Sequence, residues 1–522
     1  MIITTAKRSR LPRPLCLAPM ATALLAALPA HAAWNIIPSI SLSESYTDNV
    51  NLQTDERKQA RWVTEASPGV AVTGKSSRLD FDANARLSYY AYSGSDVPGT
   101  RSSEQRYNAN GRATVINDLF FVDAGASKRA YSVSAFGPRV EDDGSRYLDE
   151  NRTDVRTWRV SPYLAHRFGN FASVLARYSH DSVNTDRDRG GYSDSSADSL
   201  VLNIASGSGF RRVGWNLRYA HQKLDSQAYG QTTSKNAMLG LSYLINPTLQ
   251  LTATVGHDSY DYQALGGRTS GVSWSGGFAW APSPRTSLQM SLGRHFLGNT
   301  GSLMALHRSR HTVWNISYSD AVTTTRSQFT LPAAVDTASM LDSLFSPRIP
   351  DPLLRRQAVD AYIQAAGLPP TLANSINYLT NRYIRQKLLQ ASVAANWRHS
   401  GAVLSAYVSE REALSLAEVD SSLLGSELRS LNDNVRQYGL SGTYNYRLSA
   451  RSNARASLTA TRTRSLTTGL EDDQKILRLG LSHRLGRNLR GGLEFRHRVG
   501  EGDYLRRDYT ENAITATISA QL

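Results

Sequence analysis

From Ala513 to Leu522, apolar and polar side chains alternate along the chain. Threonine, serine or glutamine separates the apolar positions, which are Ile514, Ala516, Ile518, Ala520 and Leu522. A period of two places the two kinds of side chain on opposite faces of a β-strand. A two-faced strand at the carboxyl terminus is typical of bacterial outer-membrane barrels. Most such barrels end in an aromatic residue, whereas this chain ends in leucine.

The same alternation recurs along the chain, and two kinds of connection join its segments. Short connections contain turn-forming residues such as glycine, proline, asparagine and serine. They fall at 75–77, 117–118, 168–170, 209–211, 246–248, 283–285, 308–310, 400–401, 449–451 and 486–488. Longer polar connections include 137–150, 186–196, 418–434 and 500–507. Short turns at one rim and long loops at the other indicate the periplasmic and extracellular ends of a barrel, and they predict about 22 strands, within a range of roughly 18 to 24.

Composition narrows the fold class. The 522-residue chain contains 25 tyrosines, 12 phenylalanines and 8 tryptophans, and its mean hydropathy is −0.38. Beyond the amino-terminal segment, the sequence holds no run of about 18 apolar residues that could form a transmembrane helix. Abundant tyrosine fits the aromatic girdles of a barrel. We therefore predict an all-β fold, a transmembrane antiparallel β-barrel; the alternative is a soluble β-sandwich or β-solenoid.

Alternation also predicts which side chains face the lumen. Between positions 79 and 89, apolar residues alternate with aspartate, asparagine, arginine and serine. On the lipid face a charge near the midplane would cost about 2–4 kcal/mol, so the charged row faces the lumen. The lumen-lining candidates are Arg86, Arg218, Arg478, Arg490, Glu494, Arg496 and Arg498. These arginines either attract anionic solutes or pair with acidic residues across strands and brace the wall. Because so large a barrel is too wide for side chains to fill, its interior should be a watered channel or hold a plug.

The first 32 residues have the pattern of a secretory signal peptide. Lysine and arginine at positions 7–13 precede an apolar run over 15–28, and Ala30-His31-Ala32 supplies a small-residue cleavage site. The alternative, a membrane anchor, is disfavoured because the run is too short to span a bilayer and contains proline. Residues 33–522 would then form the barrel in the bacterial outer membrane. That part has no thiol, because the one cysteine is Cys16.

The alternation stops over 331–378, where helical signals replace it. Asp351 can cap a helix that has Pro352 at its first position, and apolar residues at helical spacing continue to the Gly367-Leu368-Pro369-Pro370 stop. We interpret this segment as two or three short helices inserted in one loop at the long-loop rim. The insertion caps the extracellular mouth, folds into the lumen, or forms a rigid surface loop.

Five segments of the chain are distinctive: PSISLSESYTDNV at 38–50, SYS at 317–319, TTTRSQ at 323–328, RIPDP at 348–352 and SEREAL at 409–414. Together they resemble the PEP-CTERM system-associated outer-membrane proteins. The resemblance spans nearly the whole mature chain. That family is found with exosortase and exopolysaccharide biosynthesis loci, so the resemblance implies a role in exporting or anchoring polysaccharide at the outer membrane. It provides no catalytic residues to transfer.

No arrangement of residues indicates catalysis, a cofactor or a metal. His257, Asp258 and Ser259 include the side-chain types of a hydrolase triad, but neighbours on a strand point to alternate faces. The acidic clusters 141–143 and 471–473 lack the glycine-spaced loop of an EF-hand, so solvated loop charge is preferred to a cation site. No phosphate-binding loop is present. We therefore expect no enzymatic activity, no cofactor and no metal site.

The formal net charge of +15 would fit a nucleic-acid-binding protein, but export separates the chain from nucleic acid. In a barrel, basic side chains can occupy the lumen or meet lipid phosphates at the rims. The expected partners are outer-membrane lipid and lipopolysaccharide, an anionic exopolysaccharide and periplasmic export components, while the oligomeric state stays open. Three functions remain: a channel or docking protein for exopolysaccharide export first, a general or substrate-specific diffusion porin second, and an outer-membrane hydrolase or adhesin third.

Overall fold

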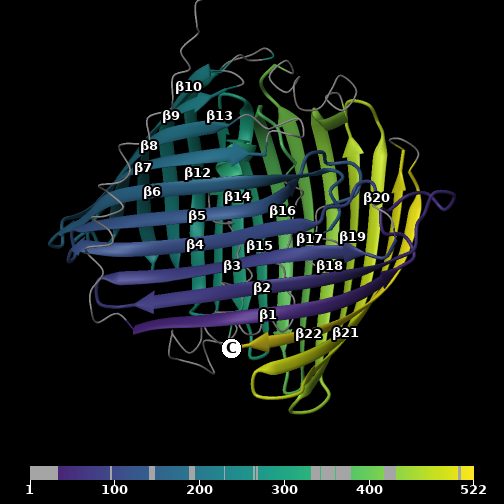
Figure 1. The fold of residues 1–522 in the computed structure, drawn as a ribbon. Helices are drawn as coiled ribbons and strands as arrows, with labels where there is room; N and C mark the ends of the chain where they lie inside the picture. Colours follow the sequence, from purple (N-terminus) through teal and green to yellow (C-terminus); the bar gives the residue numbers. More distant parts are fainter. Residues whose placement is uncertain are drawn as a thin grey trace, which may run out of the picture.

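The fold is one closed antiparallel β-sheet. The computed structural model describes residues 33–522 except 95–96, 140–146, 187–193, 228–229, 263–264, 266–268, 331–340, 342–358, 360–377, 417–430 and 504–506. Each of its 22 strands pairs with the next along the chain, and β22 pairs with β1. The sheet therefore closes into a barrel (Figure 1). The predicted fold class is confirmed, and so is the predicted number of strands.

The strands are long enough to cross a bilayer at a tilt. Their bounds are β1 (Ala33–Thr47), β2 (Arg61–Lys75), β3 (Leu79–Tyr92), β4 (Ser103–Ile116), β5 (Phe120–Ser132), β6 (Arg152–Phe168), β7 (Ala172–Thr185), β8 (Ser195–Ser206), β9 (Val213–Ser226), β10 (Gly230–Asn246), β11 (Leu249–Tyr260), β12 (Ser270–Ser283), β13 (Thr286–His295), β14 (Gly298–Arg308), β15 (Thr312–Thr324), β16 (Tyr383–Asn396), β17 (Ser400–Ala413), β18 (Asn434–Arg447), β19 (Ser452–Ser465), β20 (Glu471–Arg484), β21 (Leu489–Gly502) and β22 (Tyr509–Gln521).

The predicted short turns all lie at one rim, together with the start of β1 and the end of β22. Gly169 in one of them has a φ of 54°, a left-handed conformation that glycine adopts without strain. One predicted turn is shifted. The Trp397 amide donates to the Ser400 carbonyl at 2.8 Å, so the turn closes before Ser400-Gly401, and Gly401 already pairs with Asn396.

The connections at the opposite rim are longer, with two exceptions: residues 227–229 alone join β9 to β10, and the β13–β14 connection is shorter still. β13 and β14 are joined there by Phe296 and Leu297 alone, and these two strands are also short. The loop predicted over 500–507 begins later than expected because β21 continues to Gly502. The wall of the barrel is therefore lowest at the β13–β14 hairpin.

Large apolar side chains cover the outer face of the barrel. Val272, Trp274 and Leu292, for example, are each more than half exposed on that face (63%, 57% and 58%). Aromatic rings gather near both rims, such as Tyr446 close to the short turns and Trp62 close to the long loops. An apolar band between aromatic girdles is the lipid-facing surface of an outer-membrane barrel. The protein therefore spans the bacterial outer membrane, with short turns in the periplasm and long loops outside the cell.

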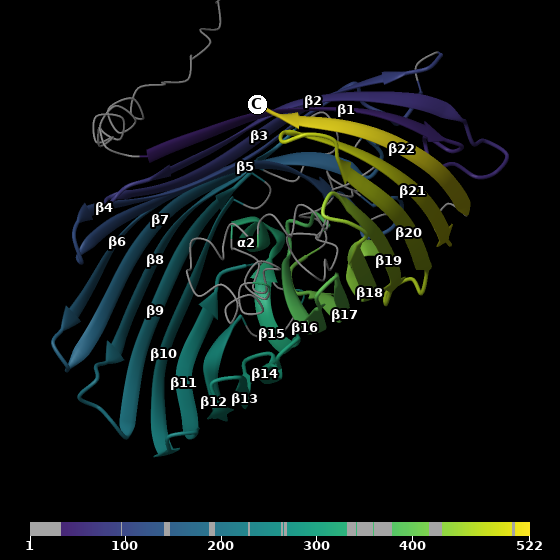
Figure 2. The ribbon, with the colours of Figure 1, turned by 90° about the horizontal axis from the view of Figure 1, so that it is seen from below.

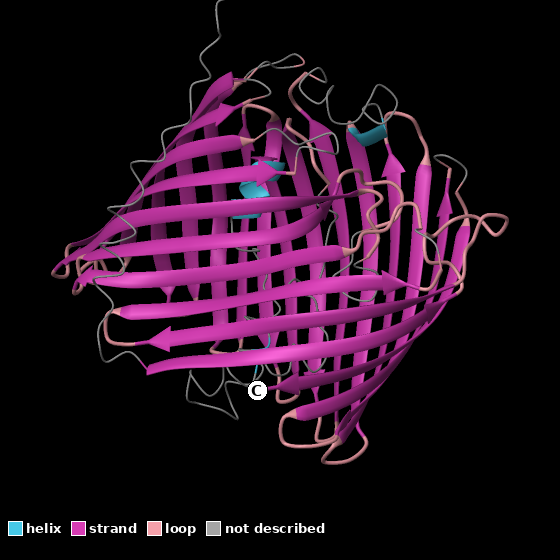
Figure 3. Cartoon of the chain, in the orientation of Figure 1, coloured by secondary structure: helices cyan, strands magenta, loops and turns pink. Residues whose placement is uncertain are grey.

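Helix contributes little to the described structure (Figure 3). α2 (Thr325–Thr330) follows β15, and among the described residues no helix is both long and apolar enough to cross a membrane. The predicted signal peptide (1–32) lies outside the described residues. The predicted helical insertion (331–378) also lies outside them, apart from Leu341, Val359 and Tyr378.

Two hairpins separate from the preceding strand in the extracellular half of the barrel, while they stay paired with the following strand. β4 and β5 pair only as far as Tyr107 and Lys128. Above that point β5 remains paired with β6 alone, as far as the Ser132–Arg152 pair. Likewise, β15 pairs with β14 only as far as Ser319, yet it continues with β16 to the Thr324–Tyr383 pair. The upper ends of β5–β6 and β15–β16 therefore separate from β4 and β14.

The two hairpins meet inside the barrel. The Leu379 amide donates to the Ser132 carbonyl at 3.1 Å, and the rings of Tyr131 and Phe329 lie 4.4 Å apart. α2 lies within the ring of strands (Figure 2), where its Arg326 is bonded to Asp181 of β7. We call residues 129–139, 147–155, 320–330 and 378–387 the lumenal crossing, because together they run across the extracellular half of the lumen.

The crossing also reaches the opposite wall. Ala135 and Phe136 pack with Tyr378, Leu431 and Val435. Beyond them, the Gly137 amide donates to Asp472 at 3.1 Å, and Gln474 donates to the Gly137 carbonyl at 2.6 Å. A wide barrel cannot fill its lumen with wall side chains, and here inward-folded chain occupies part of it.

We predict that the closed barrel resists denaturation by detergent until it is heated. Unheated protein from the membrane fraction should migrate faster on a denaturing gel than boiled protein, because the intact barrel stays compact. Deleting residues 509–522 removes the strand that closes the sheet and should abolish the fast band, whereas deleting residues 54–58 in an extracellular loop should preserve it. Identical mobility before and after heating, with the protein in the soluble fraction, would contradict the closed barrel.

Candidate functional site

The predicted lumen residues lie on the inner face, but they are not equally accessible. Arg496 donates to Glu511 at 2.7 Å, and both side chains are only 1% exposed. Arg498 lies 3.8 Å from the same carboxylate, which also accepts a hydrogen bond from Thr47 at 3.0 Å. Arg496 and Arg498 therefore brace the wall from a buried position and are not available to a solute.

An inward loop covers this buried group. Tyr147, from the loop between β5 and β6, is 4% exposed, and burial raises its pKa to about 12. Its neighbours there include Glu511 and Arg496. A loop that folds into the lumen therefore explains why these charges are buried on a face where water was expected.

A second predicted group is only partly covered. Arg455 donates to Glu494 at 2.9 Å, and Arg478 lies 4.0 Å from the other carboxylate oxygen. Their side chains keep between 16% and 22% of their surface exposed. One carboxylate here faces two guanidinium groups, so this part of the lumen keeps a net positive charge.

The remaining predicted arginines are exposed within the barrel. Arg86, Arg218 and Arg490 share the inner face with Ser88, Asn216 and Glu494. Arg218 and Arg490 form no ion pair with any residue in the described ranges. Both interpretations made from the sequence therefore apply, at different positions: Arg496 and Arg498 brace the wall, while Arg218 and Arg490 present positive charge to the lumen.

Charge is distributed unevenly around the inner wall. Strands β3–β9 and β19–β22 carry most of it. Basic residues on their inner faces are Arg86, Arg106, Arg112, Arg129, Arg159, Arg167, Arg177, Arg218, Arg455, Arg478, Arg484, Arg490, Arg496 and Arg498, and acidic ones are Asp80, Asp82, Glu104, Asp123, Asp181, Asp472, Glu494 and Glu511. The lumen beside these strands is therefore cationic.

The facing sector is lined mainly by hydroxyl groups. Hydrogen bonds join Thr254 to Ser275 at 2.5 Å, Ser291 to Ser302 at 2.7 Å and Ser405 to Ser441 at 2.7 Å. These pairs belong to neighbouring strands between β11 and β18. One side of the lumen thus offers positive charge, and the other offers neutral hydrogen-bonding groups.

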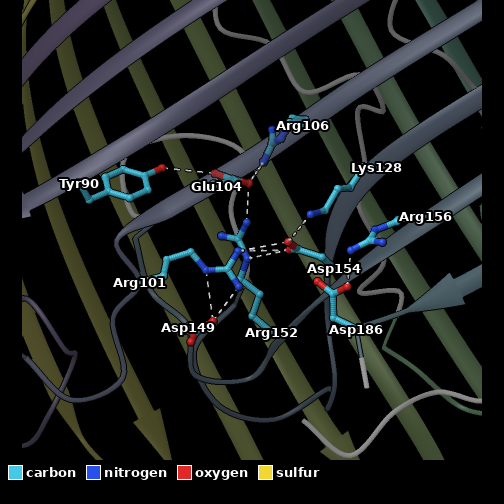
Figure 4. Close-up of polar contacts among 10 residues, drawn as sticks. All are labelled: Tyr90, Arg101, Glu104, Arg106, Lys128, Asp149, Arg152, Asp154, Arg156 and Asp186. Carbon is cyan, nitrogen blue, oxygen red and sulfur yellow. Dashed lines mark hydrogen bonds and ion pairs between the residues drawn. The ribbon is translucent and has the colours of Figure 1, made fainter. Parts of the chain in front are cut away.

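An ion-pair cluster fills the space where β5 separates from β4 (Figure 4). Arg152 of β6 donates to Glu104 of β4, and the Tyr90 hydroxyl donates to the same carboxylate at 3.3 Å. Arg101 donates to Asp154 at 3.3 Å. We call this group, with its further members, the β4–β6 cluster; its residues are Arg101, Glu104, Lys128, Asp149, Arg152 and Asp154.

Because its charges are buried, this cluster holds the β5–β6 hairpin in place. Glu104 and Asp154 are 5% and 6% exposed, and Arg152 is 2% exposed. Removing one partner of a buried ion pair leaves the other charge uncompensated and costs about 3–5 kcal/mol, whereas an exposed pair contributes about 0–1 kcal/mol. The β4–β6 cluster therefore holds one half of the lumenal crossing against the inner face of β4.

The sequence did not identify this cluster. Alternation along β6 assigns Arg152 and Asp154 to the same face as Leu164, which is exposed to lipid. They become internal because the upper β5–β6 hairpin separates from β4 and turns that face toward the inner side of β4. The one signal in the sequence that could have identified the cluster was the presence of charged residues at strand positions that alternation assigns to the lipid face.

The periplasmic rim is strongly basic. We consider the residues of each short turn and the two residues on either side of it. The acidic residues at these positions are Asp80 and Asp118. We call the arginine and lysine residues at these positions the periplasmic collar; they are Lys75, Arg78, Arg167, Arg211, Arg212, Arg285, Arg308, Arg310, Arg398, Arg447, Arg451, Arg484, Arg487 and Arg490. Each collar residue except Arg308 is exposed, and Lys75 faces Asp80 across the strand pair.

The other sequence candidates gain no chemical role. Asp258 accepts a hydrogen bond from Asn236 of β10, while the neighbouring His257 lies on the opposite face of β11. Asp473 pairs with Arg462 at 2.5 Å, and the cluster 141–143 lies outside the described residues. In the described ranges, no group of three or more histidine, cysteine, aspartate or glutamate side chains could hold a metal ion.

Comparison with known proteins shows likeness only among solved structures. No family model matches the chain, and no curated protein matches it. The ferric enterobactin receptor PfeA from Pseudomonas aeruginosa, in complex with BCV-L6, has a TM-score of 0.46 and 10% identity, with 93% of this chain and 81% of that chain covered.

Two further structures are similar at the same level. The siderophore receptor PirA from Pseudomonas aeruginosa has a TM-score of 0.39 and 9% identity, with 94% and 80% of the two chains covered. OccAB4 from Acinetobacter baumannii has a TM-score of 0.35 and 9% identity, with 95% and 100% covered. Likeness at this level concerns the barrel alone and carries no functional information.

Proposed function

We propose that this outer-membrane barrel is a channel for anionic solutes and that its solute is an acidic exopolysaccharide. The observation that carries the proposal is the excess of arginine on the inner wall, with Arg218 and Arg490 exposed and without ion pairs in the described ranges. A cleft lined by one sign of charge raises the local concentration of the opposite charge. The resemblance to the PEP-CTERM system-associated proteins supports the choice of exopolysaccharide.

The two sectors of the lumen suit a charged sugar chain. Guanidinium groups form charge-assisted hydrogen bonds with carboxylates, as uronate sugars would supply. Hydroxyl groups on the facing wall, such as Ser291 and Ser405, can exchange hydrogen bonds with sugar hydroxyls. An extended polymer could contact both sectors at once, whereas a small ion needs only the positive charge.

The lumenal crossing argues against a wide, unobstructed diffusion porin. Its two hairpins are joined at Ser132 and Leu379 and are fastened to the wall by buried charges. A polymer could pass only if the crossing shifts, so transport would be gated. The general porin remains the competing function, and the two differ in their response to acidic polymer.

We predict an anion-selective lumen whose selectivity depends on its exposed arginines. Replacing Arg86 and Arg218 with glutamate (R86E/R218E) changes charge on the inner face and leaves the lipid-facing residues intact, so insertion should survive. The reversal potential of single channels in a salt gradient should indicate anion preference for the wild type and a clear shift toward cations for the variant. Acidic oligogalacturonate should block wild-type current, and neutral dextran should not.

The matched control is R57E/K58E, which reverses two exposed charges in an extracellular loop; it should retain wild-type selectivity. A wild-type channel that prefers cations would refute the proposal. Equal block by dextran and oligogalacturonate would favour the general porin. Reversal of Arg496 is unsuitable for this test because it would bury two carboxylates together at Glu511.

We also predict that loosening the β4–β6 cluster opens the channel. The double substitution E104Q/D154N removes two carboxylates that neutralise Arg101 and Arg152. Because those guanidinium groups would then be buried without full compensation, the β5–β6 hairpin should detach from β4 more often. Single-channel recording should show a several-fold increase in conductance or open time, and the temperature at which the fast gel band disappears should fall only slightly.

D123N provides the control for that measurement. Asp123 also lies between two arginines, Arg112 and Arg177, at 2.9 Å from each, but it belongs to the regular wall below the point where β5 departs. Its substitution should leave conductance unchanged. If folded E104Q/D154N conducts like the wild type, the crossing does not limit transport.

A further inference from the structure

The periplasmic and extracellular rims differ in how their charges are satisfied. Outside the cell, several rim arginines are paired: Arg101 lies 2.7 Å from Asp149, and Arg382 and Arg507 bond Asp433 and Glu150. At the periplasmic rim, Arg447, Arg451, Arg484, Arg487 and Arg490 are exposed and form no ion pair with described residues. Among the described residues, exposed arginines without an ion pair are therefore concentrated at the periplasmic end of the barrel.

The positions of these residues identify the side from which a ligand would approach. Arg447, Arg484 and Arg490 alternate with lipid-facing Tyr446, Leu485 and Leu489, so they lie on the inner face at the ends of β18, β20 and β21. Arg484 and Arg490 are direct partners across the β20–β21 pair. Immediately above them, Arg455 and Arg478 share one carboxylate, Glu494. The collar is thus continuous with the cationic wall of the lumen.

An anionic phospholipid is the alternative ligand for such a rim. Lipid head groups surround the barrel and would meet outward positions, which Tyr444 and Tyr446 occupy in this sector. The three strand-end arginines instead border the mouth of the lumen. This placement favours a polyanion that enters the lumen over one that stays in the membrane.

We infer that the periplasmic collar is a docking surface for a polyanionic chain, which loads from the periplasm before it enters the lumen. The inference rests on the proposed function and adds a direction to it. Positive charge at one mouth steers a polyanion to that mouth and raises its association rate by a factor of about 10 to 1,000. Such steering weakens with salt, because charges are screened over about 8–10 Å at physiological ionic strength.

The test measures binding of fluorescent oligogalacturonate to the full-length mature barrel in nanodiscs of zwitterionic phosphatidylcholine, which leave both mouths accessible. Wild-type affinity should fall steeply as salt is raised. The collar variant R447E/R484E/R490E should bind at least about tenfold more weakly at low salt. The control variant R57E/K58E/K235E carries the same change of net charge at the extracellular side and should bind like the wild type.

Two outcomes would overturn the inference. The first is a collar variant that binds like the wild type, or a control variant that loses affinity equally. The second is competition by lipid. If the wild-type protein retains phosphatidylglycerol through purification, and if it no longer binds oligogalacturonate in phosphatidylglycerol nanodiscs, the rim is a lipid site.

The conductance measurements separate this inference from the proposed function. Anion selectivity without collar-dependent capture would refute the docking surface alone. Collar-dependent capture without anion selectivity would support the docking surface and refute the channel. The heat-shifted gel band verifies that each variant is folded before binding is measured.

Discussion

The structure depends on one constraint: within hydrocarbon every backbone amide and carbonyl must find a partner in the protein. A sheet meets that requirement only when its edges are joined, and here β22 pairs with β1 along nine residue pairs, from Ser39–Gln521 to Thr47–Ala513. Closing 22 strands creates a lumen that wall side chains cannot fill. The inward hairpins, the buried charges and the cationic wall all follow from having that interior space.

Charge in this protein falls into three environments with different consequences. Above the apolar band on the outer face, an ion pair such as Arg436–Glu410 lies where head groups replace hydrocarbon, so it costs little. Inside, the β4–β6 cluster and the Arg496–Glu511 pair are buried and hold inward segments in place. At the periplasmic rim, Arg447, Arg484 and Arg490 face water without an ion pair among the described residues. This third group is exposed where a solute can reach it.

The sequence predicted the barrel well because lipid and water impose opposite demands on alternate residues. Because of that demand, the two-residue period of apolar and polar side chains was enough to predict the number of strands and the positions of the turns. It also predicted that Arg86 and Arg478 are on the inner face. It could not predict which inner-face charges are buried, because burial of Arg496 depends on Tyr147 from a loop far away in sequence. Nor could it predict the crossing, since local alternation does not record where β4 stops pairing with β5.

The periplasmic collar could be predicted from the sequence only in part. Every arginine in it could be read from the turn segments, but the charge becomes meaningful only when strand pairing brings separate turns to one rim. Arg451 and Arg487 illustrate this, because their turns become neighbours through the β19–β20 pair. A short count of charge at each rim, made after the turns were assigned, would have exposed the asymmetry.

The most direct test of the account is to ask whether polysaccharide passes through the lumen. A photocrosslinking amino acid placed at position 218 faces the lumen, and the same group at position 217 replaces a lipid-facing leucine that is 40% exposed. In cells exporting acidic polysaccharide, illumination should attach glycan to the protein at position 218 and not at 217. Normal export without an adduct at 218, or equal adducts at both positions, would contradict transport through this lumen.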